Sequence, residues 1–120
     1  MEFLKKNAMK FLKKAEESFK AEEFNFTMFF VEQFFQLTLK YLIGKRYGDF
    51  PKIHNLKSLF ELSKEDKLLN FYKQNLDTFR EIELSYIASR YLDIEYSDTI
   101  AEKSLKLAKE FLEVASIGEW

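Results

Sequence analysis

FNFTMFFVEQFFQLTLKYLI, residues 24–43, places apolar side chains on nearly every side of a helix. Its polar residues recur at intervals that return to the same side of a 3.6-residue helix, and they form one narrow stripe of Asn25, Glu32, Gln36 and Lys40. A helix that packs against one neighbouring layer needs only one apolar face. We therefore expect this helix to be enclosed by its own domain and by a second subunit, in a homodimer formed through Phe24 to Ile43.

The composition favours one all-helical domain over residues 1–120. A chain of 120 residues is long enough for a single domain, which withdraws roughly two-thirds of its surface from water on folding. It has 14 Phe and 6 Tyr but only 3 Gly and 1 Pro, too few turn residues for an all-β sandwich. We expect an all-α, up-and-down helical bundle of four long helices plus a short helix.

Charge and cysteine content exclude several functional classes. Because 19 basic residues nearly balance 20 acidic ones, no global field draws the chain to nucleic acid or anionic lipid. The chain has no cysteine and one histidine, so a disulfide framework, a thiolate zinc site and any site of several imidazoles are excluded. We expect neither a metal nor a cofactor.

No segment has the pattern of a signal peptide or a membrane span. The lysine-rich N-terminus lacks an uninterrupted apolar core followed by small residues. In residues 24–43, Glu32 and Lys40 would each add a few kcal/mol to the cost of inserting a segment of marginal length. We expect a cytoplasmic protein.

Apolar residues recur every three to four positions along most of the chain and predict helices over residues 2–19, 22–43, a short segment after 54, 64–90 and 97–116. Gly44 is expected to end the second helix because glycine readily takes the left-handed conformation of a helix end. His54 or Asn55 can cap the short helix. Residues 44–53 form the main loop.

Arg90 is the most unusual charged residue in this pattern. It lies eighteen positions, or five helical turns, beyond Tyr72 and so points the same way as the core stripe of the helix over 64–90. A guanidinium in line with a core stripe needs a partner. Asp93, Glu95 or another carboxylate is one candidate, and an anionic ligand is the other.

Two groups of residues are candidates for chemistry. His54 can act as a general acid or base near neutral pH, or its ring can fix the loop that follows Pro51. Arg90 offers a planar fork for phosphate and Tyr91 a stacking face for a base, with Arg46, Lys45 and Lys40 as possible additions. The alternative for Arg90 is an internal ion pair. No glycine-rich phosphate loop, metal-ligand motif or nucleophile elbow is present.

Four motifs, in this order, resemble the HEPN domain family over nearly the whole chain. They are Phe30-Val31-Glu32-Gln33, Lys40-Tyr41-Leu42, the element from Gly48 and Pro51 to His54-Asn55-Leu56-x-x-Leu59, and Ser89-Arg90-Tyr91. The chain has Asn55 where the family usually has Asp, and Leu92 where it usually has Pro.

The resemblance implies a helical bundle that dimerises and that associates with a minimal nucleotidyltransferase protein in toxin and antitoxin pairs. It also implies a cleft of Lys40, His54, Arg90 and Tyr91 that binds a nucleotide or RNA. Family members that act as metal-independent RNases carry an Arg followed four to six residues later by a His, and this chain has no such pair. The expected function is a non-catalytic binding module. The alternatives are an RNase with a rearranged site, using His54 with Arg46 or Arg90, and a purely structural interaction protein.

Overall fold

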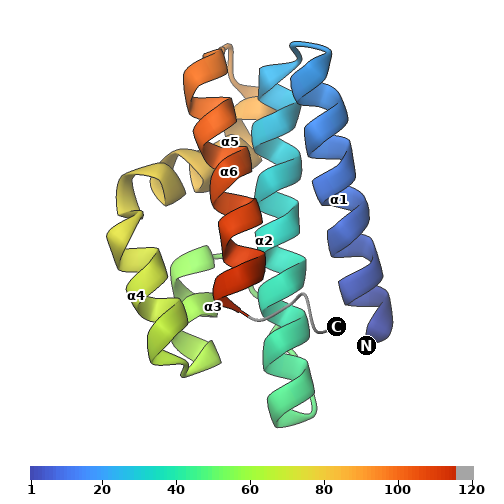
Figure 1. Cartoon of the computed structure of the whole chain (residues 1–120), viewed down its shortest axis with the longest axis vertical. Helices are drawn as coiled ribbons and strands as arrows, with labels where there is room; N and C mark the ends of the chain where they lie inside the picture. Colours follow the sequence, from blue (N-terminus) through green and yellow to red (C-terminus); the bar gives the residue numbers. More distant parts are fainter. Residues whose placement is uncertain (116–120) are drawn as a thin grey trace.

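The fold is built around one long helix, α2 (Phe24–Tyr47), with three other long helices packed along it. These are α1 (Glu2–Lys20), α5 (Leu76–Tyr91) and α6 (Asp98–Val114), and they run up and down the long axis of the bundle (Figure 1). Two short helices, α3 (Leu56–Ser63) and α4 (Asp66–Gln74), close one side. The computed structural model describes residues 1–115, and these contain six helices and no strand. The all-α bundle is confirmed.

Four phenylalanines from four helices make the centre of the core. Phe35 of α2 lies 4.9 Å from Phe79 of α5 and 5.2 Å from Phe111 of α6, measured between ring centroids. Phe60 of α3 contacts the same two rings at 5.1 and 5.9 Å. All four pairs are edge-to-face, a geometry that adds about 0.5–1.5 kcal/mol per pair beyond the burial of apolar area. The high phenylalanine content thus serves to fasten α3, α5 and α6 to α2.

The second helix extends beyond the predicted end at Gly44. It continues for almost one more turn and stops at Gly48, whose φ of 89° is left-handed and whose backbone N–H donates to the carbonyl of Gly44. Gly44 is an interior helical residue, and its missing side chain leaves room for the sulfur of Met1. The prediction chose the wrong glycine of the pair. The loop consequently covers residues 48–55 instead of 44–53.

One chain covers most of α2. Thirteen of its residues are buried, and α1, α3, α5 and α6 all contact it. The expectation that its own subunit is unable to enclose this helix is therefore wrong, because the neighbouring helices surround it. The burial argument for a dimer through Phe24 to Ile43 no longer applies, while the dimer itself stays a prediction.

The single helix predicted over residues 64–90 is two helices that meet at Asn75. Asn75 has φ −124° and ψ 29°, outside the helical range, and its side-chain amide donates to the carbonyl of Phe71 at 2.9 Å. Asparagine side chains compete in this way with the helical hydrogen bonds of the backbone. The break turns α4 away from α5 (Figure 1). Because of the break, Tyr72 and Arg90 do not lie on one side of a continuous helix. Arg90 is therefore not in line with the core stripe and is exposed.

Side chains cap the starts of two helices, and Asn55 is one of the two caps predicted for the short helix. Asn55 caps α3 by accepting a hydrogen bond from the Ser58 N–H at 3.0 Å, and Ser97 caps α6 by accepting from Ile100 N–H at 3.3 Å. The predicted end of the last helix at Ser116 and the last residues of the 1–120 domain lie outside the described residues. No helix within residues 1–115 is long and apolar enough to cross a bilayer.

The two glycines of α2 give a direct test of where this helix ends. We expect Gly48→Ala to lower the free energy of unfolding by about 1 kcal/mol because alanine is strained at positive φ. Gly44→Ala should instead raise it by about 0.5–1 kcal/mol because alanine favours a helix interior and the exposed Met1 side chain can move aside. Urea denaturation of both variants measures the difference. The opposite order of stabilities would place the end of the helix at Gly44.

Candidate functional site

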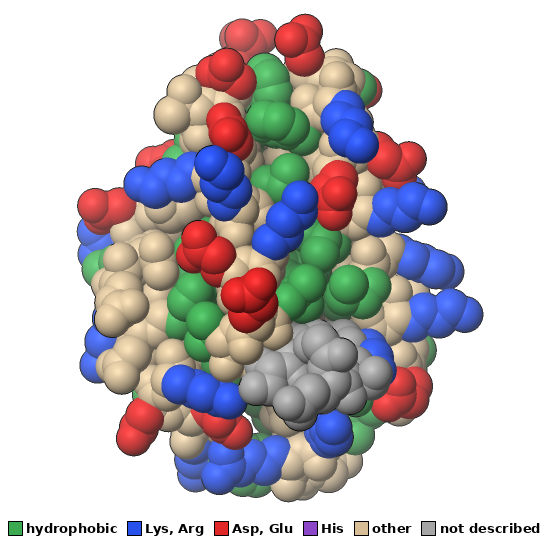
Figure 2. All heavy atoms as spheres, in the orientation of Figure 1, with side chains coloured by type: hydrophobic (Ala, Val, Ile, Leu, Met, Phe, Trp, Pro, Cys, Tyr) green, Lys and Arg blue, Asp and Glu red, His purple; other side chains and the backbone are tan. Residues whose placement is uncertain are grey.

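On the face of the bundle on which α6 lies, lysine and arginine side chains are interspersed with aspartate and glutamate, and apolar side chains show between them (Figure 2). The candidate residues predicted from the sequence lie instead on α2, on the loop 48–55 and on α5. That is where a polar network enters the core.

A chain of hydrogen bonds links a buried carboxylate to the only histidine. Glu32 of α2 is 1% exposed, and its two oxygens accept from the side-chain amides of Gln33 at 2.8 Å and Gln36 at 2.6 Å. The amide oxygen of Gln36 lies 3.0 Å from His54 Nδ1. The Gln36 amide nitrogen donates to Glu32, so the amide oxygen of Gln36 is the atom that faces His54. This oxygen can only accept a hydrogen bond, and His54 Nδ1 therefore carries the proton. The network leaves His54 Nε2 as the ring nitrogen that can meet a ligand.

Opposing effects set the pKa of Glu32. Burial raises the pKa of the Glu32 carboxyl to about 7, since a buried carboxylate loses its hydration. The two amide hydrogen bonds lower this pKa, whereas the nearby negative charge of Glu83 raises it. Lys40, two helical turns further along α2, lowers it. Glu32 therefore titrates near neutral pH at the base of the network.

Glu83 of α5 holds the far end of the loop in place. One of its carboxylate oxygens accepts from the backbone N–H of Leu56 at 2.7 Å and of Lys57 at 3.3 Å, at the start of α3. A carboxylate is favourable at this positive end of a helix. His54 directly precedes this helix start, so α2 and α5 together fix the position of the ring.

Aromatic rings and an arginine stack beside His54. The His54 ring is stacked on Tyr86 of α5 with 5.8 Å between centroids. The Arg90 guanidinium lies 4.2 Å from the centroid of Tyr86, 5.0 Å from that of Tyr91 and 5.6 Å from that of Phe29. Its Nε–H donates to the Tyr86 carbonyl at 2.8 Å. We call Phe29, His54, Tyr86, Arg90 and Tyr91 the aromatic–arginine stack.

Arg90 is not paired with a carboxylate in the described part of the chain. Within residues 1–115 it makes no ion pair, so the expected internal pair with Asp93 or Glu95 is wrong. Its charge is held by aromatic faces, an arrangement worth about 0.5–1 kcal/mol at an exposed site. Several guanidinium N–H groups therefore stay available to an anion.

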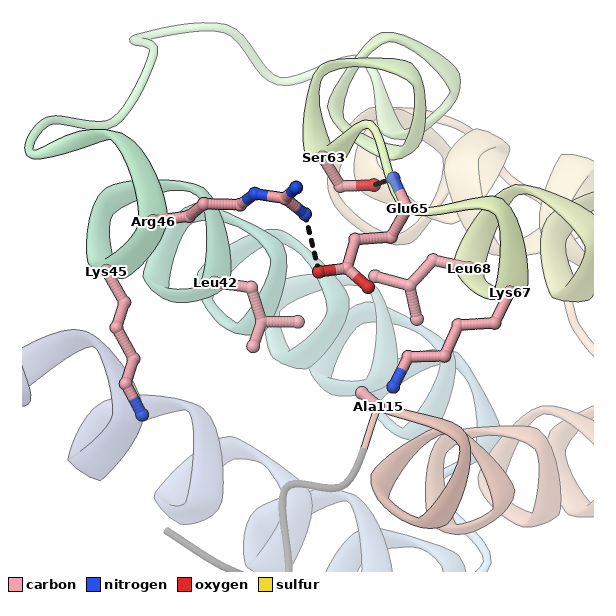
Figure 3. Close-up of a pocket in the computed structure, with 8 residues that line it drawn as sticks. All are labelled: Leu42, Lys45, Arg46, Ser63, Glu65, Lys67, Leu68 and Ala115. Atoms are coloured by element: carbon pink, nitrogen blue, oxygen red, sulfur yellow. Dashed lines mark hydrogen bonds and ion pairs between the residues drawn. The ribbon is translucent and has the colours of Figure 1, made fainter.

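The other predicted residues are placed differently. Lys40 is on the same face of α2 as Gln36, one turn further on, and is 8% exposed. Burial lowers its pKa and the carboxyl of Glu32 raises it. Arg46 is used elsewhere, because its Nη1 lies 2.8 Å from Glu65 Oε1 at the edge of a pocket of about 380 Å³ that Lys45 and Lys67 also line (Figure 3). The structure thus brings together His54, Arg90 and Tyr91 and does not bring Arg46 to them.

Sequence reasoning missed several members of this site, among them Gln33, Glu83, Tyr86 and Phe29. A signal for the first was present, since Glu32 lies inside an otherwise apolar segment and needs nearby donors. Glu83 and Tyr86 come from a helix distant in the sequence, and no local pattern pairs them with His54. Among residues 1–115, no group of three or more His, Cys, Asp or Glu side chains is arranged to hold a metal ion.

The protein-family comparison gives one match over almost the entire chain. The family model described as HEPN domain matches residues 1–118. No curated protein and no solved structure matches the chain.

The raised pKa of Glu32 predicts how stability depends on pH. Between about pH 4.5 and 7 the folded chain keeps a proton that the unfolded chain has lost, so the free energy of unfolding should fall as pH rises through this window and level off above it. The slope from this group is at most about 1.4 kcal/mol per pH unit. We expect Glu32→Gln to remove this part of the slope, as measured by urea denaturation at a series of pH values. Glu110→Gln, at an exposed position of α6, should keep it. Equal slopes in wild type and Glu32→Gln would contradict the assignment.

Proposed function

The chain belongs to the HEPN domain family, and on that premise we propose that it is a non-catalytic module that binds a nucleotide or single-stranded RNA through the aromatic–arginine stack. The observation that carries the proposal is the Arg90 guanidinium held over Tyr86, exposed and without a carboxylate partner in the described chain. Planar rings bind unpaired bases by stacking, and a guanidinium binds phosphate through paired N–H donors. One surface of this chain offers both.

The exposure of the stack supports this function. Tyr91 is 72% exposed and Tyr86 partly so, which leaves ring faces and edges for a base. Base stacking on an aromatic side chain contributes about 1–3 kcal/mol per base. The four central phenylalanines, by contrast, are fully buried and offer no face to a ligand.

Arg90 is the group of the stack that fits the phosphate of such a ligand. It makes one hydrogen bond, through Nε, so its other guanidinium N–H groups can donate to phosphate oxygens.

The same geometry gives little support to cleavage. The Arg and His pair typical of the family's RNases is missing from the sequence, and Arg46 is paired with Glu65. We therefore place binding before catalysis. The remaining route to cleavage uses His54 as acid or base with Arg90 as the group that stabilises the phosphorane.

Binding of a fluorescent single-stranded RNA, measured by anisotropy, tests the proposal. We expect Arg90→Ala to weaken binding at least roughly tenfold because it removes charge-assisted hydrogen bonds and one layer of the stack. Arg90→Lys should recover only part of the affinity, since an ammonium keeps the charge and loses the planar stacking. Lys103→Ala removes one exposed positive charge on α6 and should bind like wild type.

The same samples separate binding from cleavage. The RNA is incubated with the protein in EDTA and its length is then measured; the proposal expects intact RNA. If wild type shortens the RNA and His54→Ala does not, the protein is an RNase and the proposal of a non-catalytic binding module is wrong. Affinity equal to wild type in Arg90→Ala would remove the stack from the function altogether.

A protein partner is the second candidate, and a specific surface favours it. Leu84, Ile87 and Tyr91 lie three to four positions apart along α5 and are 44%, 51% and 72% exposed. This spacing places them in one stripe on the outer side of the helix, followed by exposed Leu92 and Ile94. We propose this stripe as the surface for a second copy of the chain or for a minimal nucleotidyltransferase.

Sedimentation velocity at micromolar concentrations tests the first of these partners. We expect a dimer in wild type and a monomer in Ile87→Glu, because a charge in the centre of an apolar contact is desolvated without a partner. Leu62→Glu, at a comparably exposed position of α3, should stay dimeric. If wild type is a monomer, the proposal of a homodimer is wrong and a different protein is the remaining candidate partner.

A further inference from the structure

A second concave surface lies on the side of the bundle closed by the short helices. It is a hollow of about 630 Å³ between α3, α4 and α5, within the usual range for small-molecule sites. The hollow exists because the break at Asn75 turns α4 away from α5. None of the residues of the aromatic–arginine stack lines it.

The floor of the hollow is apolar. Leu69 of α4 and Leu76 of α5 are partly buried there, beside the ring of Tyr72. That ring is held from behind by Phe60 and Phe79, with centroids 4.9 and 5.1 Å away. The floor is therefore anchored to the central phenylalanine cluster and is preformed.

Tyr72 is 6% exposed and lines the hollow, and its hydroxyl makes no hydrogen bond with any residue from 1 to 115. Burial and the charges of Glu83 and Glu61 raise the pKa of this hydroxyl, whereas Arg80 lowers it, and the group stays protonated. The hydroxyl can therefore donate a hydrogen bond to an acceptor on a ligand in the hollow.

The rim of the hollow is positive. Lys57, Lys73 and Arg80 line it, and none of them makes an ion pair with a residue in the described part of the chain. Of the two carboxylates that also line it, Glu83 is used by the backbone N–H groups at the start of α3. Glu61 is exposed, as are the three cations. The cations that line the hollow thus outnumber its carboxylates by three to two.

We propose that this hollow binds a small amphipathic anion, with an aromatic or branched apolar body on Leu69 and Leu76 and its anionic group at the Tyr72 hydroxyl and Arg80. The ligand is a free molecule with a carboxylate, sulfonate or phosphate group. A nucleotide bound at the aromatic–arginine stack occupies a different surface, and Glu83, which holds the start of α3, borders the hollow as well.

The probe for this site is 8-anilinonaphthalene-1-sulfonate, an aromatic anion whose fluorescence rises in apolar surroundings. We expect saturable binding to the full chain, roughly tenfold weaker in Arg80→Ala and several-fold weaker in Tyr72→Phe, through loss of a charge-assisted and a neutral hydrogen bond. N-phenyl-1-naphthylamine has the same rings without the sulfonate, and Arg80→Ala should leave its binding unchanged. Lys103→Ala serves as the charge control.

The location is checked by amide chemical shifts of the labelled protein. Chemical-shift changes on addition of the probe should concentrate on α3, α4 and the start of α5. Leu76→Trp, which fills the hollow, should abolish these changes. The far-UV circular dichroism of this variant should stay that of a folded helical protein. Shifts centred elsewhere, or equal affinity in wild type and Arg80→Ala, would overturn the proposal. Sedimentation with phosphatidylglycerol vesicles that depends on Arg80 would also overturn it, in favour of a membrane surface; we expect the protein to stay in the supernatant.

Discussion

A carboxylate inside a hydrophobic bundle must be neutralised or supplied with hydrogen-bond donors, and Glu32 meets this requirement at the centre of α2. Gln33 and Gln36 donate to it, and Gln36 in turn fixes His54. Replacement of any member leaves another without its partner, so the network behaves as a unit. The orientation of the histidine in the loop 48–55 thus depends on this buried carboxyl group through Gln36.

The same helix carries the packing and the polar network on different sides. Phe34 and Phe35 contact the central phenylalanine cluster, whereas Glu32 and Gln36 lead to His54 and to the stack on α5. A helix this long needs neighbours on nearly every side to bury its apolar residues. The bundle supplies them within one chain, and the exposed apolar residues on the outer side of α5 are the surface that we propose for a partner.

The break at Asn75 has consequences for both candidate sites. A continuous helix from 64 to 90 would carry Arg90 toward the core and leave no hollow beside Tyr72. Because the chain turns there, Arg90 rests on Tyr86 at the surface and Tyr72 forms the floor of a separate cavity. The two surfaces thus lie on either side of a helix break at which the Asn75 side chain donates a hydrogen bond to the Phe71 carbonyl.

The sequence by itself determined the helical class, the central place of residues 24–43, a cap at His54 or Asn55 and the candidacy of His54 and Arg90. Periodicity, capping and residue chemistry are local properties. Tertiary structure decided which glycine ends α2, where the fourth predicted helix breaks, and that Glu83 and Tyr86 join His54. These outcomes depend on contacts between helices far apart in the chain, such as Met1 against Gly44 or Tyr86 against His54. A spacing pattern within one segment contains no information about such contacts, so only the folded arrangement of the six helices could specify them.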